Sequence, residues 1–293
     1  MATLAQWAEG ARPRTLPAAA APVIVGSAAA YHAGEFSGWL ALAALAVALS
    51  LQIGVNLAND YSDGIRGTDL ERVGPMRLVA SGAASPSAVK YAAFGWFGAG
   101  ALFGLVLVIA SAQWWLLAIG VAAIAAAWFY TGGKNPYGYR GLGEVGVFVF
   151  FGLVAVLGTQ LTQAGRITLV GVLGAISIGL LACALLMVNN IRDIAGDRMA
   201  GKMTLAVRMG ERNARLSYVA MIAVPILLGS LAAPATGGWS LLVCLLLAPA
   251  VLLSIPVLAG AWGRALIMVL SGTGLYELGF ALLFAIALVL GAR

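Results

Sequence analysis

Residues 167–197 read ITLVGVLGAISIGLLACALLMVNNIRDIAGD, a long apolar run that ends in a short cluster of polar and charged side chains. The run carries no charge before Arg192 and, as a helix, is long enough to cross the hydrocarbon core of a bilayer. The cluster that follows it contains two aspartates, Asp193 and Asp197. Carboxylates beside a bilayer are costly and are rarely kept without a role, so this stretch indicates both the fold and a functional site.

The whole chain has the composition of a polytopic membrane protein. Of its 293 residues 62% are hydrophobic and only 10% are charged, whereas a soluble domain has about 25% charged residues. Apolar stretches long enough to cross as helices occur at about 15–34, 38–58, 88–110, 113–131, 143–163, 167–190, 214–233, 239–260 and 265–291. We therefore expect an all-α bundle of nine transmembrane helices that forms a single domain over residues 1–293.

The basic residues predict how this bundle is oriented. With the N-terminus in the cytoplasm, all of the 17 lysines and arginines except Arg166 and Arg293 fall on the cytoplasmic side. This is the orientation that the positive-inside rule predicts. The net charge of +6 is then explained largely by topology and requires no nucleic-acid partner. The long polar loops at 59–87, 132–142 and 191–213 lie inside, so the functional face is expected to be cytoplasmic.

All five aspartates of the chain lie in two polar clusters, each at the cytoplasmic end of an apolar helix. The first cluster is NLANDYSDGIRGTD at 56–69, and the second is NNIRDIAGD at 189–197. Residues four, seven or eight positions apart share a face of a helix, so each cluster directs two carboxylates and at least one amide oxygen the same way. The residues concerned are Asn56, Asn59, Asp60 and Asp63 in the first cluster, and Asn189, Asp193 and Asp197 in the second.

Such clusters suit a divalent metal and a phosphorylated ligand. Mg²⁺ prefers oxygen ligands and is usually held by one or two carboxylates together with substrate phosphates. Two facing clusters are therefore expected to hold Mg²⁺ around a diphosphate, with their four aspartates as catalytic residues. The alternative is that the aspartates form salt bridges at the helix ends with Arg66, Arg192 or Arg198.

Basic side chains near the clusters are candidates for binding the phosphates. Arg66, Lys134, Arg140 and Lys202 lie on the cytoplasmic loops among glycines that let the backbone approach a ligand. Arginine and lysine neutralise phosphate oxygens and would stabilise a leaving diphosphate. Among the four, Lys202 is expected to take part in catalysis.

The loop at 130–144 supplies the remaining candidates for substrate binding. The rings of Tyr130 and Tyr139 can shield a carbocation by cation–π attraction, although aromatic residues are also enriched at any membrane interface. Glu144 begins an apolar helix from the cytoplasmic side and can polarise an acceptor or act as a base. Both tyrosines and Glu144 are therefore predicted to contact the acceptor or the donor.

Several motifs resemble the UbiA-type superfamily of intramembrane aromatic prenyltransferases. Within it, they look most like the branch that acts on 1,4-dihydroxy-2-naphthoate in menaquinone biosynthesis. Besides the two aspartate clusters, the motifs are ARPRTLPAAAAPVIVG at 11–26, GPMRLVASG at 74–82, YTGGKNPYGYRGLGE at 130–144 and AGKMTLAVRMG at 200–210.

The resemblance implies a reaction. A polyprenyl diphosphate binds through Mg²⁺ to the two aspartate motifs, its allylic C–O bond ionises, and the naphthoate ring attacks the carbocation. In this branch the attacked carbon bears the carboxylate, so CO₂ is released along with diphosphate. The resemblance also implies that the prenyl tail lies in an apolar groove open to membrane lipid. The enzyme would then lie in the bacterial inner membrane, with its active site facing the cytoplasm.

Three alternative functions share part of this pattern. A prenyltransferase of the same superfamily that acts on another acceptor, such as 4-hydroxybenzoate, would carry the same aspartate motifs. A CDP-alcohol phosphatidyltransferase would have two further aspartates soon after residues 60–67, whereas here the next pair is Asp193 and Asp197. A transporter would have its ion site near the bilayer midplane, whereas both clusters lie at helix ends.

Overall fold

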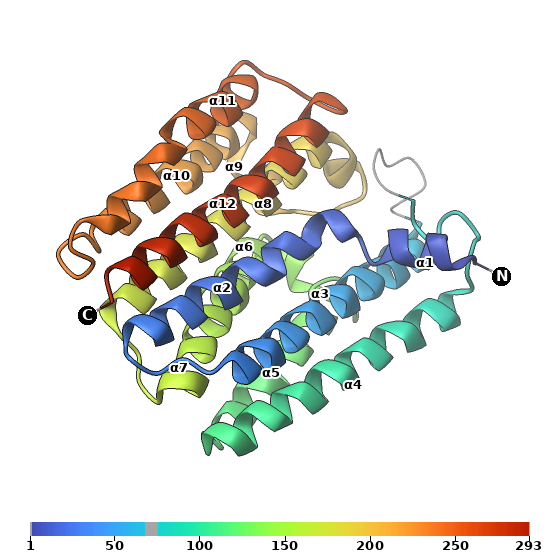
Figure 1. Cartoon of the computed structure of the whole chain (residues 1–293). Coiled ribbons are helices and arrows are strands. Elements are labelled where there is room, and N and C mark those ends of the chain that lie inside the picture. Colours follow the sequence, from blue (N-terminus) through green and yellow to red (C-terminus); the bar gives the residue numbers. More distant parts are fainter. Residues whose placement is uncertain (1, 68–75, 293) are drawn as a thin grey trace.

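The computed structural model describes residues 2–67 and 76–292, and the described residues form helices and short connections without a β-strand among them. The helices lie along one another in a bundle (Figure 1). Asp69 and Arg293 lie outside the described residues. The elements are α1 (Leu4–Gly10), η1 (Pro13–Thr15), α2 (Leu16–His32), α3 (Gly38–Arg66), α4 (Pro86–Ser111), α5 (Leu116–Phe129), η2 (Tyr137–Arg140), α6 (Gly143–Val147), η3 (Phe148–Leu157), α7 (Gly158–Ala164), α8 (Leu169–Met199), α9 (Leu205–Met209), α10 (Glu211–Ser230), η4 (Trp239–Leu246), α11 (Leu247–Leu258) and α12 (Ala265–Leu290).

Seven of the described helices are long and apolar enough to cross a membrane. They are Gly38–Arg66, Pro86–Ser111, Gly143–Ala164, Leu169–Met199, Glu211–Ser230, Trp239–Leu258 and Ala265–Leu290. The stretches predicted at 15–34 and 113–131 form α2 with 17 residues and α5 with 14 residues, shorter than the roughly 20 that span a bilayer core. The prediction of an all-helical protein with several membrane spans is confirmed, and the count of nine spans stays a prediction.

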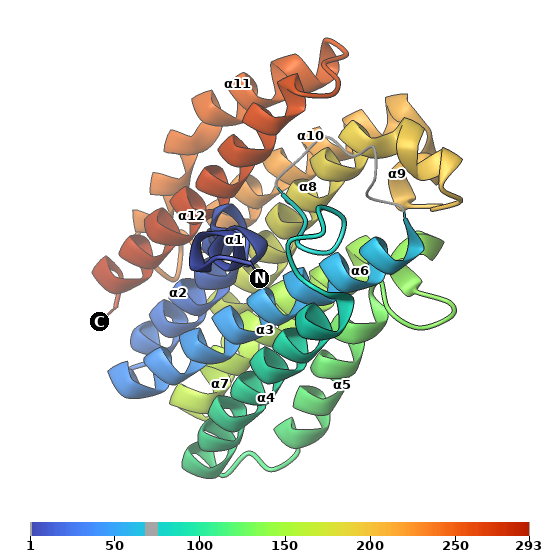
Figure 2. The same ribbon diagram turned by 90° about the vertical axis from the view of Figure 1, so that its right-hand side faces the viewer.

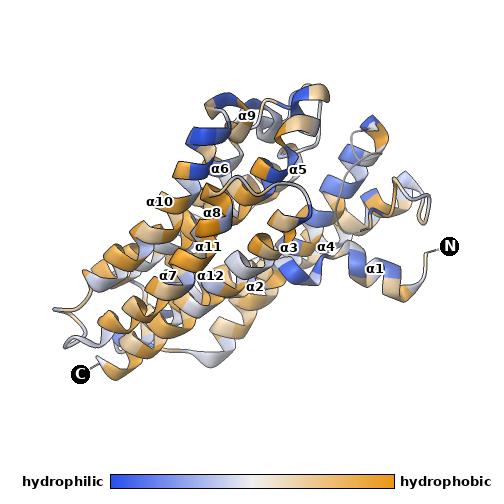
Figure 3. Cartoon of the chain, turned by 90° about the horizontal axis from the view of Figure 1, so that it is seen from above, coloured by the Kyte–Doolittle hydropathy of each residue, from blue (hydrophilic) through white to orange (hydrophobic). Residues whose placement is uncertain are grey.

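The bundle has two sides that meet along α2 and α8. Figures 1 and 2 show α3 and α4 side by side on one side, and α10, α11 and α12 together on the other. The largest hydrophobic core lies on the second side and is built from residues of α2, α8, α10 and α12. Hydrophilic residues gather toward the end of the bundle where α1 and α9 lie, whereas the length of the helices is largely hydrophobic (Figure 3).

Glycines allow the closest contacts between helices. A Cβ added to Gly152 would lie 2.6 Å from the Cα of Gly179, so the helix over 143–164 touches α8 backbone to backbone. A Cβ added to Gly26 of α2 would lie 2.5 Å from the carbonyl oxygen of Val156, so α2 also packs closely against the helix over 143–164. Small residues have this role in membrane bundles because apolar burial alone does not drive helices together there.

The two aspartate clusters prolong the helices that precede them. The apolar runs end at about 58 and 190, yet α3 continues to Arg66 and α8 continues to Met199. α3 then stops at Gly67, which has a φ of 70° and so takes the left-handed conformation that ends many helices. Each cluster is therefore carried on a rigid helix end, which fixes the direction of its side chains.

Candidate active site

A cavity of about 2030 Å³ runs through the bundle and brings the two clusters together. Asn59 and Asp63 of α3 line its polar end, and Asn189, Asp193 and Asp197 of α8 line the same end. Along α3 the lining continues from Asp63 to Ala44, a distance of about 28 Å at the rise of an α-helix. The cavity is thus polar at one end and apolar over most of its length.

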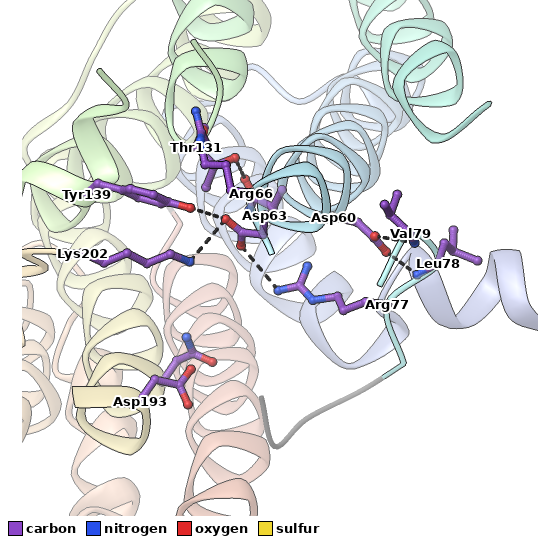
Figure 4. A network of polar contacts seen from close by, with 12 residues as sticks. Asp60, Asp63, Arg66, Arg77, Leu78, Val79, Thr131, Tyr139, Asp193 and Lys202 are labelled. Atoms are coloured by element: carbon purple, nitrogen blue, oxygen red, sulfur yellow. Dashed lines mark hydrogen bonds and ion pairs between the residues drawn. The ribbon is translucent and has the colours of Figure 1, made fainter. Parts of the chain in front are cut away.

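Asp63 is the centre of the polar network at this end. Its Oδ1 accepts hydrogen bonds from the Tyr139 hydroxyl and, at 3.3 Å, from the Nζ of Lys202 (Figure 4). The Nη2 of Arg77 lies 3.9 Å from its Oδ2. Three groups from loops far apart in the sequence therefore converge on one carboxylate, and two of them, Lys202 and Arg77, carry the positive charge that a phosphate would need.

The other polar residues of the first cluster differ in whether their side chains face the cavity. Asn59 faces the cavity, and its Oδ1 accepts a hydrogen bond from Thr131 at 2.7 Å. Asn56 also lines the cavity, but its amide nitrogen donates to Ala11 and Thr15 at 3.0 Å each. Asp60 faces the other way: it is 1% exposed, and its carboxylate does not line the cavity.

The second cluster is held by an internal ion pair. The guanidinium of Arg192 binds both oxygens of Asp193, at 2.7 and 2.6 Å, and the amide oxygen of Asn189 at 2.9 Å. The predicted alternative of a helix-end salt bridge is thus realised for Asp193. All three of these residues line the cavity, so the ion pair itself is part of its wall.

Lys202 and Tyr139 form a pair across the cavity wall. The Nζ of Lys202 lies 4.6 Å from the centre of the Tyr139 ring, and the Cζ of Arg66 lies 5.3 Å from the same ring. The N–H of Met203 donates to the carbonyl oxygen of Tyr139 at 2.9 Å, which ties the two loops together. Lys202 is 8% exposed, so its charge is shielded from bulk water.

Other predicted substrate residues lie outside the cavity wall. Arg66 donates to the carbonyl oxygens of Thr131 and Gly133. It therefore stabilises the loop that follows α5 and does not line the cavity. Lys134 and Arg140 are exposed and do not line the cavity. The structure therefore brings together Lys202 and Tyr139 but not these three basic side chains.

Tyr130 and Tyr137 line the cavity and contact each other edge to face, with ring centres 5.5 Å apart. Burial raises the pKa of Tyr137 to about 12. Burial, together with the nearby Glu144, raises the pKa of Tyr130 even further. Both phenols are therefore neutral at physiological pH, since a raised pKa favours the protonated form.

Glu144 is buried next to the residues that line the cavity but does not line it itself. It is 5% exposed, and its Oε1 accepts a hydrogen bond from the amide of Asn190 at 3.0 Å. Asn190 does line the cavity. Glu144 is thus placed to orient Asn190, while a direct contact with an acceptor is not part of this arrangement.

Four residues that line the cavity were not predicted from the sequence to belong to the site. Arg77, Thr131, Asn190 and Arg192 all line the cavity. Arg77 and Thr131 lie within the stretches 74–82 and 130–144, and Asn190 and Arg192 lie within the second cluster. Their proximity to recognised motifs was the available signal, but the direction of each side chain depends on contacts that the sequence does not reveal.

The donor set of the cavity suits a divalent cation that is shared with a phosphate ligand. Among the described residues, no group of three or more histidine, cysteine, aspartate or glutamate side chains could hold a metal alone. The polar end instead presents the oxygens of Asp63, Asp193, Asp197, Asn59 and Asn189. Mg²⁺ characteristically uses few carboxylates and takes its other ligands from water and phosphate, so the residues fit such an ion.

Residues 19–258 match the UbiA prenyltransferase family, and the chain belongs to this family. It is similar in sequence to curated proteins over most of its length. It is 53% identical to a protein of Mycobacterium tuberculosis (strain ATCC 25618 / H37Rv) named 1,4-dihydroxy-2-naphthoate octaprenyltransferase, over 99% of each chain. It is 43% identical to the Escherichia coli (strain K12) protein of the same name, over 74% of this chain and 72% of that one.

Solved structures share the architecture at much lower identity. A UbiA homologue from Aeropyrum pernix K1 superposes with a TM-score of 0.69 at 17% identity, covering 95% of this chain and 98% of that one. A UbiA homologue from Archaeoglobus fulgidus bound to DMAPP and Mg²⁺ has a TM-score of 0.62 at 14% identity, covering 97% and 99%. At such identities the likeness concerns the fold.

Proposed function

We propose that this chain is an intramembrane 1,4-dihydroxy-2-naphthoate polyprenyltransferase. It transfers a polyprenyl group from polyprenyl diphosphate to the naphthoate, releases CO₂ and diphosphate, and yields demethylmenaquinol. The observation that carries this proposal is a cavity in which carboxylates and cations share one end and apolar walls make up the rest. The names of the mycobacterial and Escherichia coli relatives support the naphthoate as acceptor.

The polar end suits the diphosphate of the donor. Asn59, Asp63, Asn189, Asp193 and Asp197 would hold Mg²⁺, which supplies Lewis-acid neutralisation of the charge that develops on the leaving group. That a homologue of the same fold is bound to DMAPP and Mg²⁺ supports a divalent metal and a prenyl diphosphate as ligands.

The chain's own cations assist departure of the diphosphate. Lys202 and Arg77 both lie within ion-pair distance of Asp63. A phosphate at this end would compete with the carboxylate for the same two side chains. Positive groups aimed at the place where negative charge develops lower the barrier of the reaction, because they stabilise that charge in the transition state.

The allylic C–O bond breaks with its electron pair on the diphosphate oxygen, and the carbocation is left beside the aromatic wall. The rings of Tyr130, Tyr137 and Tyr139 lie on this wall. Neutral phenol rings attract a cation through their faces. Tyrosine is neutral at physiological pH, and the raised pKa values of Tyr130 and Tyr137 disfavour still further the phenolates that the cation would alkylate.

The naphthoate ring then attacks through the carbon that bears its carboxylate. The new carbon–carbon bond forms at that carbon, and the bond to CO₂ breaks with its electron pair returning to the ring. No ring proton has to be removed in this sequence. That agrees with a cavity wall from which the carboxylate of Glu144 is excluded.

The prenyl tail follows the apolar length of the cavity. α5 has no buried residue, and Leu116, Leu117 and Gly120 of this helix line the cavity. A tail there lies next to a helix with little protein around it, which suits exchange of the tail with membrane lipid. We further propose that the polar end faces the cytoplasm of a bacterial inner membrane, from which the water-soluble naphthoate enters.

The test is the fate of a labelled carboxyl carbon. The protein in lipid nanodiscs receives a polyprenyl diphosphate and carboxyl-labelled 1,4-dihydroxy-2-naphthoate, and labelled CO₂ is measured together with prenylated quinol. One CO₂ for each product is expected. A prenylated product that retains the label, or a clear preference for 4-hydroxybenzoate, would assign the chain to another branch of the family.

A further inference from the structure

The carboxylate of Asp60 holds the backbone of the segment that returns to α3 after the first cluster. Its Oδ2 accepts a hydrogen bond from the N–H of Leu78 at 2.7 Å, and its Oδ1 accepts one from the N–H of Val79 at 3.0 Å. Figure 4 shows Asp60 directed toward these two residues and away from Asp63. Both oxygens are thus used by the protein backbone.

Apolar contacts fix the same segment against α3. Leu78 is fully buried beside Leu57 of α3 and Gly10 of α1. Val79 lies directly on Gly64, where an added Cβ would come within 2.5 Å of the Cγ1 of Val79. The segment therefore has little freedom to shift as long as the Asp60 hydrogen bonds and the Gly64 contact are intact.

Arg77 immediately precedes the two anchored residues, and its side chain reaches the cavity. Its Nη2 lies 3.9 Å from the Oδ2 of Asp63, and it lines the polar end. A side chain leaves the backbone in a direction set by the backbone itself. Because Asp60 fixes the next two N–H groups, it also fixes the direction from which Arg77 enters the site.

We propose that Asp60 is a positioning residue of the first aspartate cluster. It anchors the segment of Arg77 on α3 and so directs the guanidinium of Arg77 to the phosphate groups of the donor. The identity of the phosphate ligand rests on the proposed function, whereas the anchoring does not. An aspartate is required because two N–H groups need two accepting oxygens, and the negative charge strengthens both bonds.

Hydrogen exchange measures the anchoring directly. In Asp60→Asn one accepting oxygen becomes an NH₂ group, so the amides of Leu78 and Val79 should exchange about tenfold faster or more. Asp63→Asn, the same change three residues further along α3, should leave these two amides protected. Unchanged exchange in Asp60→Asn would overturn the proposal, whatever reaction the protein catalyses.

Metal binding separates positioning from ligation. Mn²⁺ is titrated into the protein with inorganic diphosphate, and bound Mn²⁺ is measured by electron paramagnetic resonance. Asp63→Asn is expected to weaken Mn²⁺ binding by about tenfold or more, and Asp60→Asn to leave it close to wild type. Equal losses in the two variants would make Asp60 a metal ligand and contradict the positioning role.

A double-mutant cycle tests whether Asp60 acts through Arg77. Asp60→Asn and Arg77→Met should each raise the KM for polyprenyl diphosphate by about tenfold. If Asp60 acts through Arg77, the double variant should resemble Arg77→Met alone, because coupled residues are not additive. Additive effects would show that Asp60 acts by another route.

Gly64→Ala gives an independent approach that changes no charge. The new Cβ would press on Val79 and displace the same segment, so exchange at Leu78 and donor KM should change as in Asp60→Asn. The control is Gly98→Ala on α4, where an added Cβ meets nothing within 4 Å and the residue does not line the cavity. A Gly64→Ala variant with wild-type exchange and KM would overturn the link between segment and site.

Discussion

Asp60 and Asp63 lie three positions apart on α3, but their carboxylates have different surroundings. Asp63 meets Tyr139 and Lys202 in the cavity, whereas Asp60 meets backbone N–H groups behind it. Three positions on an α-helix correspond to nearly one turn, so the two side chains share a face only approximately. The partners available on each side then decide the role of each carboxylate.

The first prediction concerns the carboxylates that face the cavity. Asp63→Asn and Asp193→Asn should each lower kcat by about a hundredfold or more, because the charge on the leaving group loses its stabilisation. Excess EDTA should abolish turnover of the wild type, and Mg²⁺ or Mn²⁺ should restore it. The measurement is prenylated quinol formed per minute in nanodiscs.

Ser62→Ala is the matched control for these variants. Ser62 is buried on α3 between the two aspartates and does not line the cavity. Its replacement should leave turnover close to wild type. Wild-type rates that persist in excess EDTA would refute the metal site.

The second prediction separates the two contributions of Tyr139. Tyr139→Phe removes the hydroxyl that donates to Asp63 but keeps the ring that lies over Lys202. It should lower kcat/KM by about fivefold, the effect of one hydrogen bond. Tyr139→Leu also removes the ring and should cost about a further fivefold, as expected for a cation–π contact. Equal rates in the two variants would show that the ring face contributes nothing.

At the scale of single elements, the helix over 143–164 differs from the ordinary helix that the sequence predicts. Its central part, Phe148–Leu157, has π-helical hydrogen bonding. Both Phe150 and Phe151 line the cavity, although consecutive residues of an α-helix point about 100° apart. Wider turns of this kind are rare and often occur at functional sites. Here the wider turn coincides with the close contact between Gly152 and Gly179.

The third prediction concerns the walls around the prenyl tail. Gly104 of α4 and Gly120 of α5 line the cavity, and a Cβ added to either would meet nothing within 4 Å. Leucine at these positions would therefore project into the tail space without disturbing helix packing. Gly104→Leu and Gly120→Leu should lower kcat/KM for octaprenyl diphosphate by about tenfold, in line with overfilling of a packed site. Geranyl diphosphate should be used nearly as well as by the wild type.

Gly98→Leu is the control for the tail prediction. Gly98 lies on the same helix as Gly104 and has equally open space, but it does not line the cavity. Leucine there should leave both donors unaffected. An equal loss for the short and the long donor in Gly104→Leu would mean that the tail does not pass this point.

At the scale of the whole molecule, the site exists because α3 and α8 end on the same side of the bundle. Their clusters are far apart in the sequence, and the cavity between the helix ends unites them. The loops at 130–142 and 200–204 then close the polar end, and the hydrogen bond from Met203 to Tyr139 joins these loops. The arrangement of the candidate site is therefore a property of the assembled bundle and not of any one motif.

The fourth prediction tests the orientation of the bundle. Ser87→Cys and Asn213→Cys, in a background without Cys183 and Cys244, should resist impermeant thiol reagents in intact cells. Both positions are exposed and lie in the first turns of α4 and α10, at helix ends that the basic residues place in the cytoplasm. Glu35→Cys, exposed on the opposite side of the predicted membrane, should be labelled and serves as the positive control. Labelling of Ser87→Cys or Asn213→Cys from outside would reverse the orientation or change the number of spans.

The sequence by itself determined the membrane class, the positions of the long helices and the residues of both aspartate clusters. Apolar length, charge and helical spacing are local properties, and they can be read wherever the chain carries them. Helix ends were less well predicted, because α3 and α8 continue as helices beyond their apolar runs to Arg66 and Met199. Composition marks where a helix leaves the apolar region, but not where its hydrogen bonding stops.

Only the tertiary structure decided which polar residues line the cavity. It placed Asp63, Lys202 and Arg77 around one end of the cavity, and it left Lys134 and Arg140 on the surface. It also turned Asp60 toward the backbone of Leu78 and Val79. The physical reason is that the direction of a side chain depends on the rotation of its helix and on partners from distant segments, and neither is encoded in local spacing.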